Sequence, residues 1–371
     1  MKSKKKAALG GAMLFLIYML VGAVCGILIM RYMDTAHMGG FGSYLLCFGL
    51  LLLGMYLVMY LQIILHEGGH LVCGLLSGYG FSSFRVGSLM LQKTENGLRF
   101  RRLTIAGTGG QCLMTPPELK NDTMPFVLYN LGGALMNLLT VPLFLLLSLL
   151  WPGTLAALLL QMGAVIGLAF ALANGLPLRV NGVDNDGANI LAMRRSPEAV
   201  RAFWVQLKTN ELASRGVRLK DMPEDWFTLS EEADLGNSMV TSLAVMRENR
   251  LCDMYCLDEA DAAARRLLAE DTAVPGIYRG LLLCDRIFFT LLRGEDPAAL
   301  LTKEQKKFMK SMKSFPSVLR TEYVLALHEG DSARAETLRA AFDKMARRYP
   351  NPSDIASERE LMALADEKIA A

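Results

Sequence analysis

Long apolar stretches in the first half of this 371-residue chain limit what it can fold into. Residues 7–30, 41–65 and 123–178 contain no charged side chain, and Trp151-Pro152-Gly153 interrupts the last of these stretches. A membrane-spanning helix needs about 20 apolar residues, and a Pro-Gly pair predicts a turn between two helices. The sequence therefore predicts a mainly α, polytopic membrane protein with four transmembrane helices.

The second half of the chain has a different composition. Up to about Met193 the charged residues are sparse and clustered, whereas beyond it Lys, Arg, Asp and Glu are frequent and mixed. The hydrophobic fraction of 52% averages over these two regions, so we expect a first half in the lipid bilayer and a soluble second half. The small net charge of +3 gives no reason to expect a nucleic-acid partner. The seven scattered cysteines predict reduced thiols.

The distribution of basic residues predicts an orientation in the membrane. Four lysines (Lys2, Lys4, Lys5 and Lys6) precede the first apolar stretch, and basic residues favour the cytoplasmic side. We therefore expect a cell-membrane protein whose N-terminus and C-terminal domain are cytoplasmic, with residues 31–40 outside. A signal peptide would have a shorter apolar core and a cleavage site, so segment 1–40 is predicted to be a permanent transmembrane helix and a short external loop.

The motif His66-Glu67-Gly68-Gly69-His70 follows the second apolar stretch directly. On a helix, His66 and His70 lie one turn apart on one face, where both imidazoles can bind the same Zn²⁺, and Glu67 lies beside the metal-bound water. Ionisable residues are costly in lipid and usually mark a functional site. We therefore predict a zinc site with Glu67 as the catalytic base, and we expect Gly68 and Gly69 to leave room for a substrate strand.

A catalytic zinc site needs a third protein ligand besides water. The last apolar stretch ends near Asn174-Gly175-Leu176-Pro177, and Asp184 and Asp186 follow. Pro177 and the neighbouring glycines end the helix on the side of the membrane where His66 and His70 are expected. A carboxylate from this segment could complete the site: Asp186 is the preferred ligand, and Asp184 stays open as the alternative.

Between the second and third apolar stretches the pattern is typical of β-structure. Residues 84–86 and 98–101 flank the segment Lys93-Thr94-Glu95-Asn96-Gly97, and Asn-Gly between such runs predicts a hairpin. We expect a membrane-associated β-hairpin over about residues 81–106, on the cytoplasmic side because of its arginines. Residues 106–111 predict either a connecting loop or a re-entrant or edge segment near the metal that could hold an extended substrate.

Taken together, these motifs resemble the site-2 protease family of intramembrane zinc metalloproteases. Besides HExxH, the resemblance rests on Gly133-x-x-x-Asn137, on Asn174-x-x-Pro177 and on Asp186-Gly187, and it covers about residues 41–193. Ala134 stands where the family usually has proline, and Asp-Gly follows Asn174 at a longer distance than usual. The resemblance implies zinc ligands, a water-activating glutamate and two asparagines that organise the site or the substrate: His66, His70 and Asp186; Glu67; Asn137 and Asn174.

Residues 196–371 predict a soluble helical domain. Ser196-Pro197-Glu198 has a capping residue and a proline at the first helical position. Residues 246–249, 292–296 and 327–331 are each expected to end a helix, and this succession is similar to tetratricopeptide-type helical hairpins. Such a domain could bind a regulatory protein. Five lysines between residues 303 and 313 predict a solvated basic face, or contact with anionic lipid.

The sequence thus predicts a zinc-dependent intramembrane endopeptidase that cleaves a transmembrane protein or peptide, as in regulated intramembrane proteolysis. Three parts of the chain are predicted: the first transmembrane helix with its external loop at 1–40, the metalloprotease core at 41–193 and the helical domain at 196–371. One alternative is a catalytically inactive scaffold that retains a zinc site and binds a partner through its helical domain. The intact Glu67 argues against it, because a scaffold has no use for a base beside the metal. The other alternative is a membrane protease of the prenyl-peptide-processing kind, which takes a later Glu as the third ligand.

Overall fold

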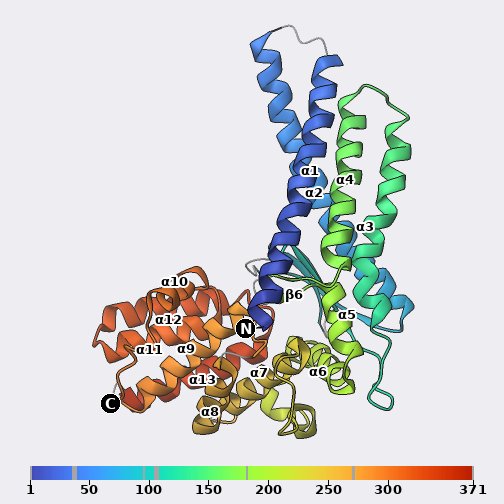
Figure 1. Cartoon of the computed structure of the whole chain (residues 1–371). Coiled ribbons are helices and arrows are strands. Elements are labelled where there is room, and N and C mark those ends of the chain that lie inside the picture. Colours follow the sequence, from blue (N-terminus) through green and yellow to red (C-terminus); the bar gives the residue numbers. More distant parts are fainter. Residues whose placement is uncertain are drawn as a thin grey trace. The chain divides into compact units, whose positions relative to one another are not determined.

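The computed structural model describes residues 2–35, 40–94, 97–103, 108–180, 183–269 and 272–369 (Figure 1). The chain divides into two compact units. The first unit comprises residues 1–87, 105–117 and 124–194, and the second comprises residues 88–104, 118–123 and 195–371. The candidate metal ligands all belong to the first unit.

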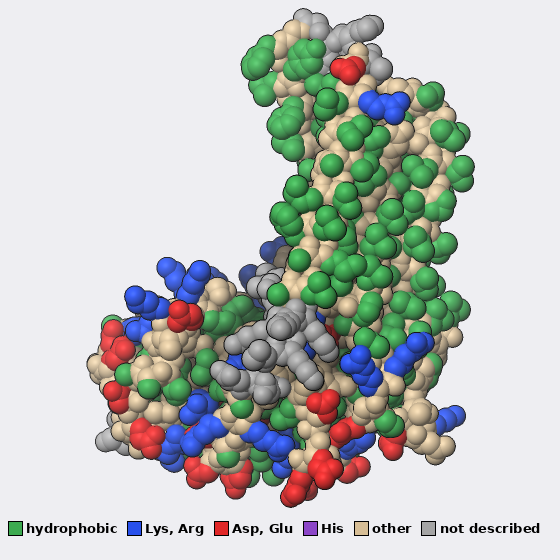
Figure 2. All heavy atoms as spheres, in the orientation of Figure 1, with side chains coloured by type: hydrophobic (Ala, Val, Ile, Leu, Met, Phe, Trp, Pro, Cys, Tyr) green, Lys and Arg blue, Asp and Glu red, His purple; other side chains and the backbone are tan. Residues whose placement is uncertain are grey.

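Among the described residues, four helices are long and apolar enough to span a membrane. They are α1 (Lys2–Thr35), α2 (Phe41–Leu76), α3 (Val127–Ser148) and α4 (Leu155–Gly175). Many of their large hydrophobic side chains are exposed (Figure 2), as expected for segments that contact lipid. The prediction of four such helices is confirmed. Gly153, with a φ of 74°, forms part of the turn between α3 and α4.

Glycines let α2 and α3 pack backbone to backbone beside the HExxH motif. A Cβ on Gly69 would lie 2.2 Å from the main-chain oxygen of Gly132, and a Cβ on Gly132 would lie 2.4 Å from that of Gly69. Small residues permit this close approach between membrane helices. Gly69 therefore accommodates α3, and not a substrate strand as predicted, whereas a Cβ on Gly68 would meet nothing within 4 Å.

A small antiparallel sheet follows α2. Strand β1 (Gly80–Val86) pairs with β4 (Gly110–Thr115), with Phe84 opposite Cys112. Strand β2 (Leu89–Thr94) pairs with β3 (Gly97–Arg102), with Thr94 opposite Gly97. The strand order is β3-β2-β1-β4, so β4 is an edge strand.

Two antiparallel strands flank the predicted turn, but one of the two predicted strands is wrong. Residues 97–102 pair with residues 89–94, whereas residues 84–86 belong to β1, whose antiparallel partner is β4. The predicted turn residues Glu95 and Asn96 lie outside the described residues. The same holds for positions 106 and 107 of the predicted loop, whose last two residues begin β4. The edge alternative for residues 106–111 agrees with β4, an edge strand that begins at Gly110. Its pairing with β1 was missed, because a pairing between distant segments cannot be read from a local hairpin signal.

Most of the second unit is a succession of helices. Their bounds are α6 (Pro197–Ser214), α7 (Ser238–Asp253), α8 (Leu257–Leu268), α9 (Gly276–Leu292), α10 (Lys303–Ser311), α11 (Pro316–His328), α12 (Ser332–Ala346) and α13 (Pro352–Ile369), with short 3₁₀ helices at Leu219–Asp221 and Glu224–Phe227. As predicted, Ser196 caps α6, because its side chain accepts a hydrogen bond from the main-chain nitrogen of Ala199.

Two of the three predicted helix ends in this unit are confirmed. Helices α9 and α11 end at Leu292 and His328, and Gly294 and Gly330 follow with a φ of 71° each. The third prediction is wrong, because residues 246–249 lie inside α7. No glycine lies directly after residues 246–249, and α7 continues to Asp253.

Candidate metal centre

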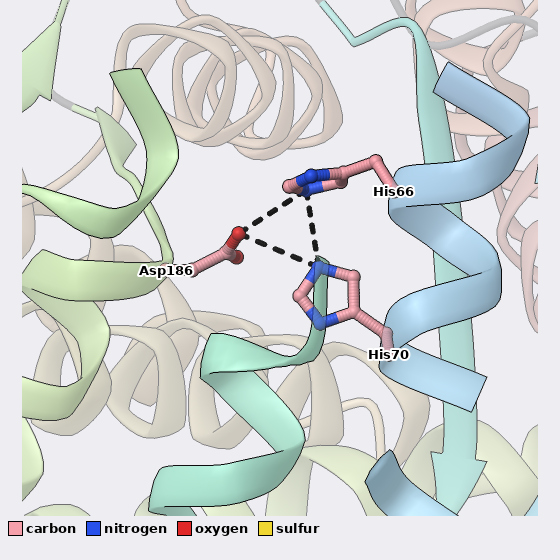
Figure 3. Close-up of side chains that lie close together, drawn as sticks. All are labelled: His66, His70 and Asp186. Atoms are coloured by element: carbon pink, nitrogen blue, oxygen red, sulfur yellow. Dashed lines mark hydrogen bonds and ion pairs between the residues drawn. The ribbon is translucent and has the colours of Figure 1, made fainter. Parts of the chain in front are cut away.

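Three potential metal ligands converge in the first unit. His66 and His70 lie one turn apart on α2, and Asp186 is the first residue of α5 (Asp186–Arg194). The two Nε2 atoms are 3.2 Å apart, and Asp186 Oδ2 lies 3.3 Å from His66 Nε2 and 3.4 Å from His70 Nε2. The three side chains point toward one another (Figure 3). The structure thus brings together the preferred ligand set of the sequence analysis.

The spacing of these atoms fits a single zinc ion. Tetrahedral zinc with bonds of about 2.0–2.1 Å places its ligand atoms roughly 3.3–3.4 Å apart, close to the three distances above. Asp186 Oδ2 is buried and accepts no hydrogen bond from the described residues, so a cation would compensate its loss of water. Gly133 keeps the adjacent space free: its Cβ would lie 2.5 Å from His66 Nε2 and 2.6 Å from His70 Nε2.

Each imidazole is oriented through its other ring nitrogen. His70 Nδ1 lies 2.8 Å from the main-chain oxygen of Tyr129, and His66 Nδ1 lies 2.7 Å from Asn137 Oδ1. With an acceptor at each position, Nδ1 carries the proton and Nε2 keeps its lone pair for a metal. The structure therefore places Asn137, predicted to organise the site, in direct contact with a candidate ligand.

Asn185 holds Asp186 at the start of α5. Its Oδ1 accepts hydrogen bonds from the main-chain nitrogens of Leu178 at 3.0 Å and Ala188 at 2.9 Å. Its Nδ2 donates to the main-chain oxygen of Leu176 at 2.6 Å. One amide side chain thus connects the end of α4 to α5. The sequence analysis did not identify Asn185, although an asparagine before a helix start is a typical cap signal.

Two further features shape the position and charge of Asp186. A Cβ on Gly187 would lie 2.4 Å from the main-chain oxygen of Gly175, so only glycine lets α5 approach α4 this closely. Burial opposes ionisation of Asp186, but without a metal the imidazoles of His70 and His66, when protonated, outweigh it and hold the pKa of this carboxyl below its usual range. A carboxylate binds a metal ion in its ionised form.

The two remaining candidates make contacts of their own. Asp184 belongs to β6 (Val183–Asp184), which pairs with β5 (Arg179–Val180), and it forms an ion pair with Arg179 at 3.0 Å. Asn174 donates a hydrogen bond to the main-chain oxygen of Phe170 in its own helix. The structure thus brings Asp186, and not Asp184, to the two histidines.

No family model, curated protein or solved structure matches this chain. The chemistry of the site is therefore inferred from its own side chains.

Glu67 is buried beside the first residue of β4. A Cβ on Gly110 would lie 2.5 Å from Glu67 Oε1 and 2.6 Å from its Cγ, so glycine at this position leaves room for the carboxylate. Because β4 is an edge strand of the sheet, one side of its main chain has no partner strand among the described residues.

Arg85 is a buried residue of the site that the sequence analysis missed. Its side chain is only 1% exposed and donates hydrogen bonds to the main-chain oxygen of Gly87 at 2.8 Å, to Thr108 Oγ1 at 2.6 Å and to the main-chain oxygen of Gly110 at 3.2 Å. Burial lowers the pKa of its guanidinium, and the carboxylate of Glu67 acts in the opposite direction. Arg85 therefore fixes the segment that leads into β4.

Proposed function

We propose that this protein is a zinc-dependent intramembrane endopeptidase of the site-2 protease type. The observation that carries the proposal is the convergence of His66, His70 and Asp186 to mutual distances of 3.2–3.4 Å. The histidines lie on a helix that is apolar enough to span a membrane, and the third ligand comes from a distant part of the chain. Such an arrangement has no simpler use than binding one metal ion.

The catalytic roles follow from the side chains around these three ligands. Zinc, when bound, would lower the pKa of water and polarise the scissile carbonyl. Glu67 accepts a proton from the attacking water and gives it to the leaving nitrogen as the carbon–nitrogen bond breaks. Asn137 and the main-chain oxygen of Tyr129 hold the imidazoles in the tautomer that leaves Nε2 free. An inactive scaffold would need the metal ligands but not Glu67.

The substrate class follows from the membrane helices and the edge strand. A transmembrane helix closes its main-chain hydrogen bonds internally and has to unwind before its peptide bonds can be attacked. We propose that the unwound segment pairs with β4, which offers main-chain groups beside Glu67. Gly68, within the HExxH motif, leaves space for this segment, because a Cβ there would meet nothing within 4 Å.

The remaining parts of the chain suggest a setting for this activity. By the distribution of basic residues, the N-terminus and the helical unit would be cytoplasmic, and the hairpin of β2 and β3, which carries Arg99, Arg101 and Arg102, would lie at the cytoplasmic surface of the cell membrane. We propose that the helices from α6 to α13 form tetratricopeptide-like hairpins that bind a regulatory protein. The prenyl-peptide-processing alternative is disfavoured, because the third residue near the histidines is Asp186 and not a glutamate.

The replacement Glu67→Gln tests the proposal. New N-termini would be labelled and sequenced in membranes of cells that produce the wild-type protein or this variant. Termini inside apolar segments should appear with the wild type and fall by about 100-fold or more with Glu67→Gln, since a general base contributes at least this much. Zinc content should not change, because Glu67 is not among the three converging ligands.

A matched control is Glu118→Gln, the same chemical change at an exposed position. It should leave the set of termini as in the wild type. If the termini persist unchanged in Glu67→Gln, the proposed role of Glu67 is wrong. If no termini depend on the wild-type protein while zinc is bound, the scaffold alternative is favoured.

A further inference from the structure

A buried chain of amide side chains leads from His66 to α4. Gln62, one turn before His66 on α2, and Asn137 on α3 are both 0% exposed. Asn137 Nδ2 donates to Gln62 Oε1 at 2.7 Å and to the main-chain oxygen of Gln62 at 3.0 Å. Gln62 Nε2 donates to the main-chain oxygen of Gly163 at 2.8 Å. This series of hydrogen bonds thus joins three of the four apolar helices, α2, α3 and α4.

The acceptor at the α4 end of this series determines which atom donates in each of its hydrogen bonds. The main-chain oxygen of Gly163 can only accept a hydrogen bond, so the Gln62 amide must turn its nitrogen toward it and its oxygen toward Asn137. Asn137 must then turn its nitrogen toward Gln62 and its oxygen toward His66. With this oxygen 2.7 Å away, His66 Nδ1 must carry the proton, and Nε2 is left unprotonated.

His70 provides an internal comparison. Its Nδ1 faces the main-chain oxygen of Tyr129 directly, and a carbonyl oxygen cannot exchange its place with a nitrogen. Asn137 could do so, because an amide turned by 180° would present its nitrogen to His66 and favour the tautomer with a protonated Nε2. The tautomer of His66 therefore depends on the two acceptors of Gln62 that hold the Asn137 nitrogen, its side-chain Oε1 at 2.7 Å and its main-chain oxygen at 3.0 Å, whereas the tautomer of His70 needs no such support.

The packing around Gln62 keeps its amide in place. Its Nε2 also donates to Thr140 Oγ1 at 3.1 Å, and that hydroxyl donates to the main-chain oxygen of Asn137 at 2.6 Å. A Cβ on Gly167 would lie 2.7 Å from Gln62 Nε2. The glycine at this position of α4 therefore leaves the space that the amide occupies.

We propose that Gln62 is a positioning residue of the metal centre, which acts through Asn137 to keep His66 Nε2 unprotonated and directed at the metal. Gln62 itself touches neither metal nor substrate. The inference rests on the proposed zinc site, but it does not require that the protein cleaves peptides. Residues that orient metal ligands typically change metal affinity by 10–100-fold when they are replaced.

The test uses the full-length protein in lipid bilayers with Gln62→Met, which keeps the length of the side chain and removes both amide groups. Zinc affinity, measured by competition with a chelator, should fall by about 10–100-fold. Gln305→Met is the matched control: it makes the same change at a buried glutamine of the helical unit, whose amide donates to the main-chain oxygen of Gly280, and it should stay within about threefold of the wild type.

The second readout is the tautomer of each histidine in zinc-free Asp186→Ala, from ¹⁵N chemical shifts of labelled imidazoles; this background removes the carboxylate that lies 3.3–3.4 Å from both Nε2 atoms and would attract the proton. His66 should then carry its proton on Nδ1. When Gln62→Met is added, only the main-chain oxygen of residue 62 still holds Asn137, so this preference of His66 should weaken while His70 keeps its own. A purely structural role of Gln62 would disturb both histidines together.

Two results would overturn the inference. One is an unchanged zinc affinity and His66 tautomer in Gln62→Met. The other is a His66 with its proton on Nε2 in Asp186→Ala, which applies even if Gln62→Met does not fold. A wild-type protein that binds zinc but cleaves nothing would contradict the proposed function and leave the role of Gln62 in place.

Discussion

At the scale of single residues, Gly133 has the most specific task in the metal centre. Gly133→Ala would put a Cβ 2.5–2.6 Å from the Nε2 atoms of His66 and His70, in the space that the ion needs. We expect zinc affinity to fall by at least about tenfold, as with other changes beside metal ligands. Chelator competition on the purified protein measures this effect.

The control for this prediction lies in the HExxH motif itself. Gly68→Ala makes the same change on α2, where a Cβ meets nothing within 4 Å, and it should bind zinc as the wild type does. Equal zinc affinities of Gly133→Ala and the wild type would show that the metal does not occupy the space beside Gly133.

The sequence predicted those site residues whose signal is local. The HExxH spacing alone identifies His66, Glu67 and His70, and the emergence of a helix near Asp186 identifies a candidate third ligand. Gln62 and Arg85 carry no comparable signal, and Asn185 carries only that of a helix cap. Gln62 and Arg85 matter through partners far along the chain, such as Gly163 and Gly110. Asn185 holds segments together across a bend, so its role became visible only in the structure.

At the scale of secondary-structure elements, β4 depends on Arg85. Arg85→Met would leave the main-chain oxygens of Gly87 and Gly110 without their buried donor, which destabilises the strand edge beside Glu67. We expect a fragment that the wild type produces to form about tenfold or more slowly in Arg85→Met. The zinc content should not change.

The variant Arg85→Lys separates the two possible roles of this side chain. Lysine keeps a positive charge near Glu67, but a single ammonium group cannot reproduce the planar fork that reaches Gly87, Thr108 and Gly110. It should therefore be impaired like Arg85→Met. Full activity of Arg85→Lys would mean that the charge matters and that the hydrogen bonds to β4 do not.

The elements that sequence patterns predicted are those that depend on neighbours along the chain. The four apolar helices and the cap at Ser196 follow from runs and spacings. The end of α7 and the pairing of β1 with β4 do not. The first depends on where packing stops supporting the helix, and the second joins strands separated by a hairpin.

At the scale of the whole molecule, the helical unit should lose stability as the pH rises. Burial raises the pKa of Glu358 to about 7 from an ordinary 4.5, although Arg320 lies 3.0 Å away and acts in the opposite direction; Asp285 and Asp354 add to the increase. Between these two values the folded chain binds more protons than the unfolded chain, so the free energy of unfolding falls as the pH rises.

Thermal unfolding, monitored through tryptophan fluorescence, can detect this effect. Trp204 and Trp226 pack together in the helical unit with ring centroids 5.1 Å apart. The wild type should melt at a higher temperature at pH 5.5 than at pH 7.5, by a few degrees. Glu358→Gln, which cannot ionise, should show a smaller difference. An equal pH dependence of both proteins would contradict the assignment to Glu358.

The central claim is that one zinc ion is bound by residues from two distant parts of the first unit: His66 and His70 on α2, and Asp186, which follows α4. Zinc content of the purified full-length protein after dialysis, compared between Asp186→Asn and Asp184→Asn, tests it most directly. We predict about one zinc per chain in the wild type and in Asp184→Asn, whose carboxylate faces Arg179, and little zinc in Asp186→Asn. Full zinc occupancy in Asp186→Asn, or its loss in Asp184→Asn alone, would contradict the account.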